Sequence, residues 1–179
     1  RVEADPGLPC NQRLSDRRIP VSPTLVPMYD DLRARVRADF PRARSELEAL
    51  IRIPSVSAPG YDPGHVRASA ELVASILTDS GLDNVQLLEL DGAHPAVYGE
   101  RQGPPGSPTL LLYAHHDVQP PGPAAQWETD PFTPIERGGR LYGRGSADDK
   151  CGIAMHLAAV RAFGDELPLT IKVFIEGEE

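Results

Sequence analysis

Two histidines and an aspartate follow directly on a run of apolar residues, and their types and spacing could support metal chemistry. The run is Leu110 to Ala114, and His115, His116 and Asp117 come next. His115 and Asp117 are two residues apart, so their side chains lie on the same side of an extended chain. A carboxylate placed there could hold the tautomer and the orientation of the His115 imidazole. The pair therefore suits a metal ligand with a supporting acid.

Two acidic clusters occur farther along the chain, Asp148 with Asp149 and Glu176 with Glu178 and Glu179. Each has an ordinary explanation, because paired aspartates commonly begin a helix and acidic residues after a strand commonly mark a solvated loop. Together, one imidazole and carboxylates from separate elements suit a hydrolytic divalent metal, with zinc the first candidate and manganese or cobalt as alternatives. A carboxylate can bridge two metals, so Asp148 is the candidate bridge, and one of the last two glutamates could stay free to take a proton from water.

These clusters must be positioned by the ends of sheet elements. The apolar run before His115 predicts a central strand buried on both faces, and such sheets bind ligands beyond the carboxyl ends of their strands. Residues 169–175 alternate in polarity and predict a second strand, directly before the glutamates. A helix is predicted from Asp148 to Phe163, with Gly164 ending it.

The rest of the chain predicts further helices and strands in alternation. Residues 28–52 have a helical pattern broken at Pro41, which suits the first turn of a second helix, and residues 65–80 form another helix ended by Gly81. Short strands are predicted at residues 85–90 and 96–100. Alternation of this kind favours a layered α/β domain over a bundle or a sandwich.

Composition excludes some functions. The formal net charge of −8 argues against nucleic acid as a partner, because a phosphate-binding surface needs a basic footprint. No apolar run has the length that crosses a membrane, and the two cysteines form no disulfide framework, so we expect a cytoplasmic protein. Residues 1–27 contain five prolines and no periodic pattern, and they predict an irregular or flexible arm before a main domain at residues 28–179.

The motifs HHDVQP, WETDPF, LYGRGSADDK and FIEGEE follow one another in an order and rough spacing that resemble the co-catalytic zinc metallopeptidase family. That family includes aminoacylase, acetylornithine deacetylase, succinyl-diaminopimelate desuccinylase, carboxypeptidase G and the carnosinase-type dipeptidases. HxDVQP and GRGSxDDK are most similar to the dipeptidase branch. The resemblance implies a three-layer α/β/α catalytic domain, of which this chain is the N-terminal part.

The resemblance also implies a role for each candidate residue. His115 would bind one metal and Asp117 would orient it, Asp148 would bridge two Zn²⁺ ions, and Glu179 would be a further ligand. Glu178 would be the general base that activates a metal-bridging water for attack on a short peptide. In relatives the peptide bond that follows the bridging aspartate is cis.

The chain departs from the family pattern because relatives carry two further ligands, an aspartate and a late histidine, and an inserted lid domain through which they dimerise. We therefore expect a fragment that is inactive alone, from a parent that is a homodimer. Two other functions stay open, an N-acyl amino acid deacylase of the same family and a non-catalytic partner-binding remnant. Cys151 is either a thiolate ligand or a small buried residue on its helix.

Overall fold

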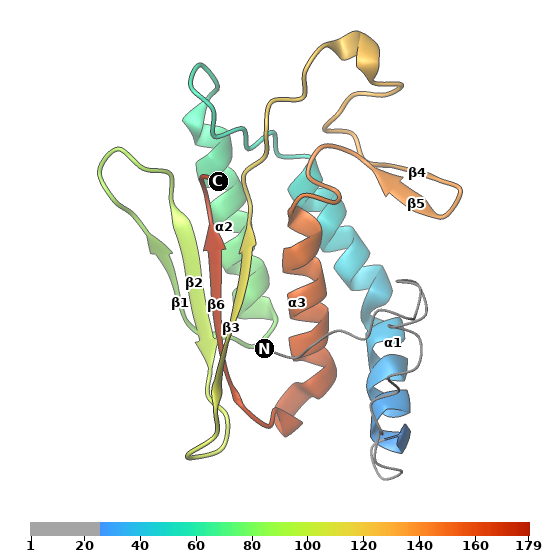
Figure 1. The fold of residues 1–179 in the computed structure, drawn as a ribbon, viewed down its shortest axis with the longest axis vertical. Helices are drawn as coiled ribbons and strands as arrows, with labels where there is room; N and C mark the ends of the chain where they lie inside the picture. The colour runs from blue at the N-terminus through green and yellow to red at the C-terminus, as the bar shows by residue number, and fades with distance from the viewer. Residues whose placement is uncertain (1–25) are drawn as a thin grey trace, which may run out of the picture.

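The computed structural model describes residues 26–179 and shows helices packed against a four-stranded sheet (Figure 1). The main elements are α1 (Val26–Ile51), α2 (Pro63–Asp79), β1 (Asp83–Leu88), β2 (Ala96–Arg101), β3 (Thr109–His115), β4 (Ile135–Arg137), β5 (Arg140–Tyr142), α3 (Lys150–Phe163) and β6 (Thr170–Glu176). The predicted α/β architecture is confirmed. The predicted arm lies outside the described residues, apart from Val26 and Pro27, which begin α1.

The sheet has the strand order β1-β2-β6-β3, and β4 pairs with β5 in a separate hairpin. Strand β2 pairs antiparallel with both β1 and β6, whereas β3 runs parallel to β6. The parallel pair brings the carboxyl ends of β3 and β6 to the same edge of the sheet, with His115 opposite Glu176. The two strands that precede the candidate residues are thus neighbours.

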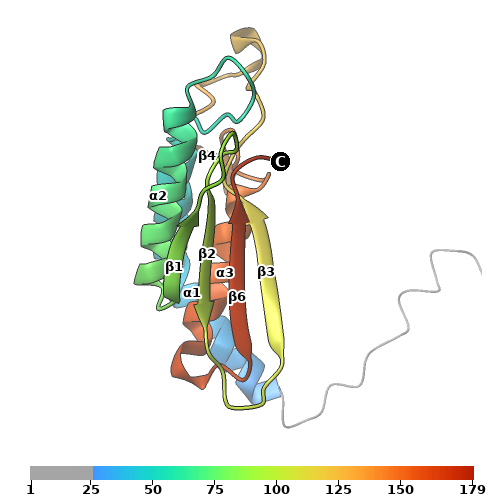
Figure 2. The ribbon, with the colours of Figure 1, turned by 90° about the vertical axis from the view of Figure 1, so that its left-hand side faces the viewer.

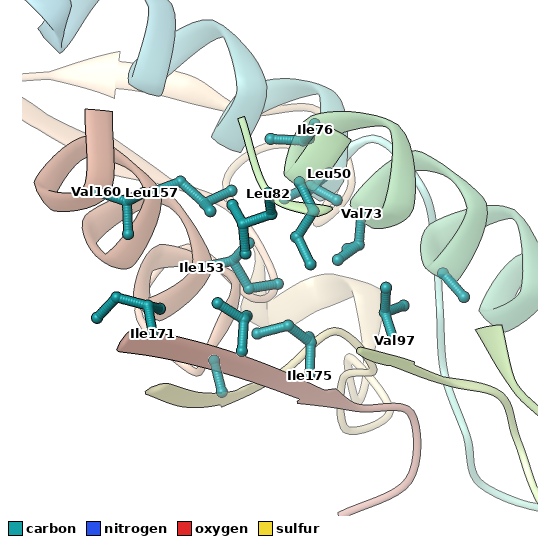
Figure 3. Close-up of a cluster of buried hydrophobic side chains, with 14 of the residues drawn as sticks. Leu50, Val73, Ile76, Leu82, Val97, Ile153, Leu157, Val160, Ile171 and Ile175 are labelled. Carbon is teal, nitrogen blue, oxygen red and sulfur yellow. The ribbon is translucent and has the colours of Figure 1, made fainter. Parts of the chain in front are cut away.

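One face of the sheet is buried against the helices, which lie on the same side of it (Figure 2). The alternation in β6 decides which side chains enter the core, because Ile171, Val173 and Ile175 are buried there while Lys172 is exposed. Figure 3 shows these isoleucines meeting side chains of the three helices. Burying this apolar surface is the main source of stability for the fold.

The buried apolar residues of α2 and α3 recur at helical spacing. In α2 the buried residues include Val66, Ala70, Val73 and Leu77, and in α3 they include Ile153, Leu157 and Val160. Gly81 follows α2 with φ +81°, which is the left-handed conformation expected of a glycine at this end of a helix.

The prediction that β3 is a central strand buried on both faces is wrong for the described part of the chain. Strand β3 lies at the edge of the sheet, and Leu110, Leu111 and Tyr113 are each about half exposed, at 47%, 58% and 47%. A continuous apolar run does not distinguish an edge strand from a central one. An edge strand can be as apolar as a central strand when a further layer or strand covers it.

The predicted break at Pro41 is also wrong, since α1 runs through it without interruption. Asp39 and Glu46 lie on opposite sides of the proline, and both contact Arg161 of α3, at 2.7 and 3.2 Å. One continuous helix presents both acids to the same guanidinium. These contacts and the packing of α1 on α3 outweigh the one backbone hydrogen bond that a proline removes.

No helix within residues 26–179 combines the length and the apolar character that crossing a bilayer requires.

Candidate metal centre

The candidate site lies where three segments of the chain meet at one edge of the sheet. His115 is the last residue of β3, and Glu179 follows β6 by three residues. Asp148 lies two residues before α3, and the peptide bond between Asp148 and Asp149 is cis, as the resemblance implied. The parallel pairing of β3 with β6 therefore brings together residues that are far apart in sequence.

The imidazole of His115 is at the centre of this cluster. Its Nε2 atom lies 3.2 Å from Oδ1 of Asp148 and 3.3 Å from Oε2 of Glu179. One ligand atom from each of the three residues lies within 4.8 Å of the other two. The His115 side chain is 7% exposed, whereas Asp148 and Glu179 are 75% and 57% exposed, so the cluster has a buried base and opens to solvent through its carboxylates.

Asp117 supports the other side of the imidazole. The Nδ1 atom of His115 lies 3.2 Å from both the Oδ1 and the backbone oxygen of Asp117. The Asp117 carboxylate is 1% exposed, and its Oδ2 accepts hydrogen bonds from the Ser57 hydroxyl at 2.6 Å and from the Glu179 backbone N–H at 3.3 Å. A proton held on Nδ1 leaves Nε2 free to face the two exposed carboxylates.

The electrostatics of the cluster favour a cation at this position. Burial lowers the pKa of His115, but the charge of Asp117, the hydrogen bond with Asp148 and the charge of Glu179 outweigh it, and the net effect is a raised pKa. The same acids that favour a proton on Nε2 would favour a metal ion beside it. A nitrogen and two carboxylate oxygens from separate segments are also a donor set that zinc accepts. The three residues thus fit one divalent metal ion.

Glu178, the predicted general base, lies beside this cluster and outside it. Its side chain is exposed and lines a neighbouring hollow together with Leu90, His94 and Phe174. Three of the five predicted site residues, His115, Asp148 and Glu179, thus converge. Asp117 contacts the other ring nitrogen of His115, and Glu178 is exposed and adjacent to Glu179 in the chain.

The other polar residues near the site have structural contacts. His116 is fully buried, its Nε2 lies 2.9 Å from the Pro95 oxygen, and burial lowers its pKa to about 4. Cys151 is half-buried, its thiol contacts the Ala147 oxygen at 3.3 Å, and it is not part of the metal-type cluster. The ring N–H of Trp127 donates to the Pro121 oxygen, which pins its loop to the domain.

Lys150 contacts a part of the chain that is distant in sequence. Its side chain is fully buried, and Nζ donates to the backbone oxygens of Leu50 and Ile53, 100 and 97 residues away. Burial lowers the pKa of Lys150 to about 7, against the opposing effect of the Asp117 charge. Sequence reasoning also missed Ser57, because a serine in a proline-rich loop is indistinguishable from an ordinary turn residue.

Comparisons by sequence and by structure both find dipeptidases among the proteins similar to this chain. The family model described as Peptidase family M20/M25/M40 matches residues 111–179. A cysteinylglycine-S-conjugate dipeptidase from Corynebacterium striatum is 38% identical over 125 residues, which are 69% of this chain and 27% of that protein. The Cys-Gly metallodipeptidase dug1 of Schizosaccharomyces pombe is 33% identical over 147 residues, covering 75% and 31%.

Another relative has a different activity in its name. A succinyl-diaminopimelate desuccinylase from Xanthomonas campestris is 46% identical over 77 residues, which are 41% of this chain and 20% of that protein. Among solved structures, human carnosine dipeptidase 1 has a TM-score of 0.70 and 26% identity, covering 83% of this chain and 34% of that one. The di-peptidase Dug1p of Saccharomyces cerevisiae has a TM-score of 0.74 at 24% identity, with the same coverage, and shows the fold. The chain thus spans between a fifth and a third of the length of the curated relatives named above.

Proposed function

We propose that this chain, which matches the model of peptidase family M20/M25/M40 over residues 111–179, belongs to that family and supplies the metal-binding part of a site that hydrolyses dipeptides. The observation that carries this proposal is the convergence of His115, Asp148 and Glu179, whose ligand atoms lie within 4.8 Å of one another. The same convergence argues against a non-catalytic remnant, because a chain without catalytic function is not expected to retain three candidate metal ligands this close together.

We propose that His115, Asp148 and Glu179 hold a divalent metal, with zinc as the first candidate and manganese or cobalt as alternatives. When bound, such a metal supplies Lewis-acid polarisation of the scissile carbonyl oxygen. Asp148 carries most of its surface in solvent, so it can reach a second ion in a parent protein that provides more ligands. Residues 26–179 contain one such cluster of candidate metal ligands.

Asp117 has a supporting role in this proposal. It keeps the Nδ1 proton of His115 in place, and its burial with three donors fixes its own position. The imidazole is then held with Nε2 directed at Asp148 and Glu179, so little energy is spent on orienting it when a ligand arrives.

Glu178 carries the proton in this proposal. Its exposed carboxylate is beside the cluster and can take a proton from the attacking water, then deliver that proton to the amine nitrogen as the peptide bond breaks. Water adds across the C–N bond, so the products are a carboxylate and an amine and no further reactant is needed.

Dipeptides are the proposed substrate class because the dipeptidase relatives match the larger share of this chain. They cover 69% and 75% of it, whereas the desuccinylase covers 41%. A second candidate is an N-acyl amino acid deacylase, which the higher identity of the desuccinylase, 46% over 77 residues, favours. Both reactions break an amide bond and need the same metal and base.

An assay of the full-length parent separates these two candidates. Purified with zinc, the parent should hydrolyse Cys-Gly and carnosine much faster than N-succinyl-diaminopimelate. Faster cleavage of the succinyl substrate would replace the dipeptidase proposal with the deacylase. Cleavage of neither, by a protein shown to contain metal, would rule out both. Homodimerisation of the parent stays a prediction, which its mass in solution tests.

A further inference from the structure

A short segment after α1 contacts both the turn that carries Asp148 and the strand end that carries His115. We call residues 53–57 the brace. It begins two residues beyond the end of α1 and lies against the chain at His116 to Val118. The proposed function assigns no role to it, although Ser55 and Val56 within it are buried.

One end of the brace is held by Lys150. The buried ammonium donates to the Leu50 oxygen at 2.8 Å and to the Ile53 oxygen at 2.9 Å, and each of these oxygens also accepts one backbone N–H, so Lys150 is a second donor to two carbonyls where α1 ends. Lys150 is the first residue of α3 and lies two residues after Asp148. The brace is therefore tied to the turn that carries the Asp148 ligand.

The middle of the brace is held by the strand end that carries the histidines. The Ser55 hydroxyl donates to the His116 oxygen at 2.7 Å, and the Val118 backbone N–H donates to the Ser55 oxygen at 2.9 Å. Val56 and Val118 form a parallel bridge, and both are buried. These contacts fix the brace in register with the residues on either side of Asp117.

The far end of the brace contacts the supporting acid directly. The Ser57 hydroxyl donates to Oδ2 of Asp117 at 2.6 Å, and the backbone oxygen of Ser57 faces Nε2 of His94 at 3.2 Å. Oδ1 of the same carboxylate contacts Nδ1 of His115. Ser57 thus holds one oxygen of Asp117 while the other holds the imidazole.

We propose that Ser57, on a brace anchored by Lys150, is a positioning residue that sets the orientation of Asp117 and through it the imidazole of His115. A short hydrogen bond to one carboxylate oxygen restricts rotation of the carboxyl group, and the second oxygen then has one direction in which to receive the Nδ1 proton. The proposal rests on the proposed function only in that the imidazole it positions is the proposed metal ligand.

The test compares Ser57→Thr with Ser57→Val, which have the same shape and differ in the hydroxyl, in the 179-residue chain. In spectra of the metal-free chain labelled with ¹⁵N, the Nδ1 proton of His115 should give a resonance that His115→Ala removes. We expect that resonance to stay in Ser57→Thr and to shift or broaden in Ser57→Val. We also expect Zn²⁺ affinity measured by calorimetry to fall about tenfold in Ser57→Val.

Ser69→Ala is the matched control. The Ser69 hydroxyl is buried and contacts the His116 oxygen at 3.2 Å, so its removal changes the same region without touching Asp117. An unchanged His115 resonance in Ser57→Val, or an equal change in Ser69→Ala, would overturn the positioning role. A change confined to Ser57→Val would support it even if the wild-type chain bound no zinc, and in that case the proposed function alone would fail.

Discussion

The Nε2 atom of His115 lies 3.2 Å from Oδ1 of Asp148, although the two residues are 33 positions apart in sequence. The contact exists because β3 ends at His115 and α3 begins just after Asp148, so two separate elements reach the same edge of the sheet. Glu179 approaches the same nitrogen from a third element. The proposed metal site therefore requires these three segments to be held together.

Glu178→Gln in the parent enzyme should lower kcat by about 10²-fold to 10⁴-fold, because an amide cannot take the proton from the attacking water. Zinc content should not change, since the Glu178 side chain lies outside the cluster of ligand atoms. Steady-state kinetics and elemental analysis of the same samples measure both. Glu100→Gln, on β2 and paired with Tyr98 and Asn84, is the control and should keep full activity. Full activity in Glu178→Gln would remove this residue from the mechanism.

Asp39→Ala should destabilise the chain by about 3 kcal/mol, because it leaves the nearly buried Arg161 without its principal partner. Urea unfolding followed by circular dichroism gives the difference in the free energy of unfolding. Asp30→Ala is the control, since its pair with Arg33 is exposed and such pairs are worth about 0.5 kcal/mol or less. Equal effects of the two substitutions would show that the Arg161 contacts do not hold α1 on α3.

Lys150→Met should also destabilise the chain, because methionine fills similar space but removes one of the two hydrogen bonds that the Leu50 and Ile53 oxygens each accept. Each lost hydrogen bond contributes about 0.5–1.5 kcal/mol. The same urea measurement applies, with Lys172→Met as the control because Lys172 is exposed on β6. A Lys150→Met chain as stable as the wild type would mean that the buried amine contributes nothing net to the fold.

Gly177→Ala should weaken metal binding as well as the fold. A Cβ atom at this position would lie 2.3 Å from the Pro95 backbone oxygen and 2.9 Å from Nε2 of His116, so the backbone leading to Glu178 and Glu179 must move. Calorimetric titration with Zn²⁺ should show lower affinity. Gly92→Ala provides the contrast, since its φ of +79° strains an alanine but its surroundings are open. Gly92→Ala should lose stability and keep its affinity, and equal affinities for both variants would contradict the prediction.

The sequence predicts the elements and much of the site because the signals are local. Alternation in residues 169–175 predicts which side of β6 is buried, and Gly81 and Gly164 mark helix ends as predicted. The prediction that His115 and Glu179 lie at ends of sheet strands follows from two apolar runs, each of which is followed by residues that can bind a metal. These features depend on neighbours in sequence.

What the sequence misses depends on contacts between distant residues. The proline at 41 predicts a break, and the continuous helix depends on the ion pairs of Asp39 and Glu46 with Arg161 and on the packing of α1 on α3. The edge position of β3 is set by the order of the strands in the sheet, and the periodicity of the sequence does not reveal that order. Ser57 and Lys150 act on residues 60 and 97–100 positions away, so their roles appear only in the folded chain.

The most direct test of the account is the binding of zinc to the 179-residue chain. Calorimetry and elemental analysis after dialysis should show one zinc ion per chain, held by His115, Asp148 and Glu179. His115→Ala should abolish this binding, whereas His65→Ala, which changes an exposed histidine on α2, should leave it intact. A wild-type chain that binds no zinc, or a His115→Ala chain that binds it equally well, would contradict the central claim.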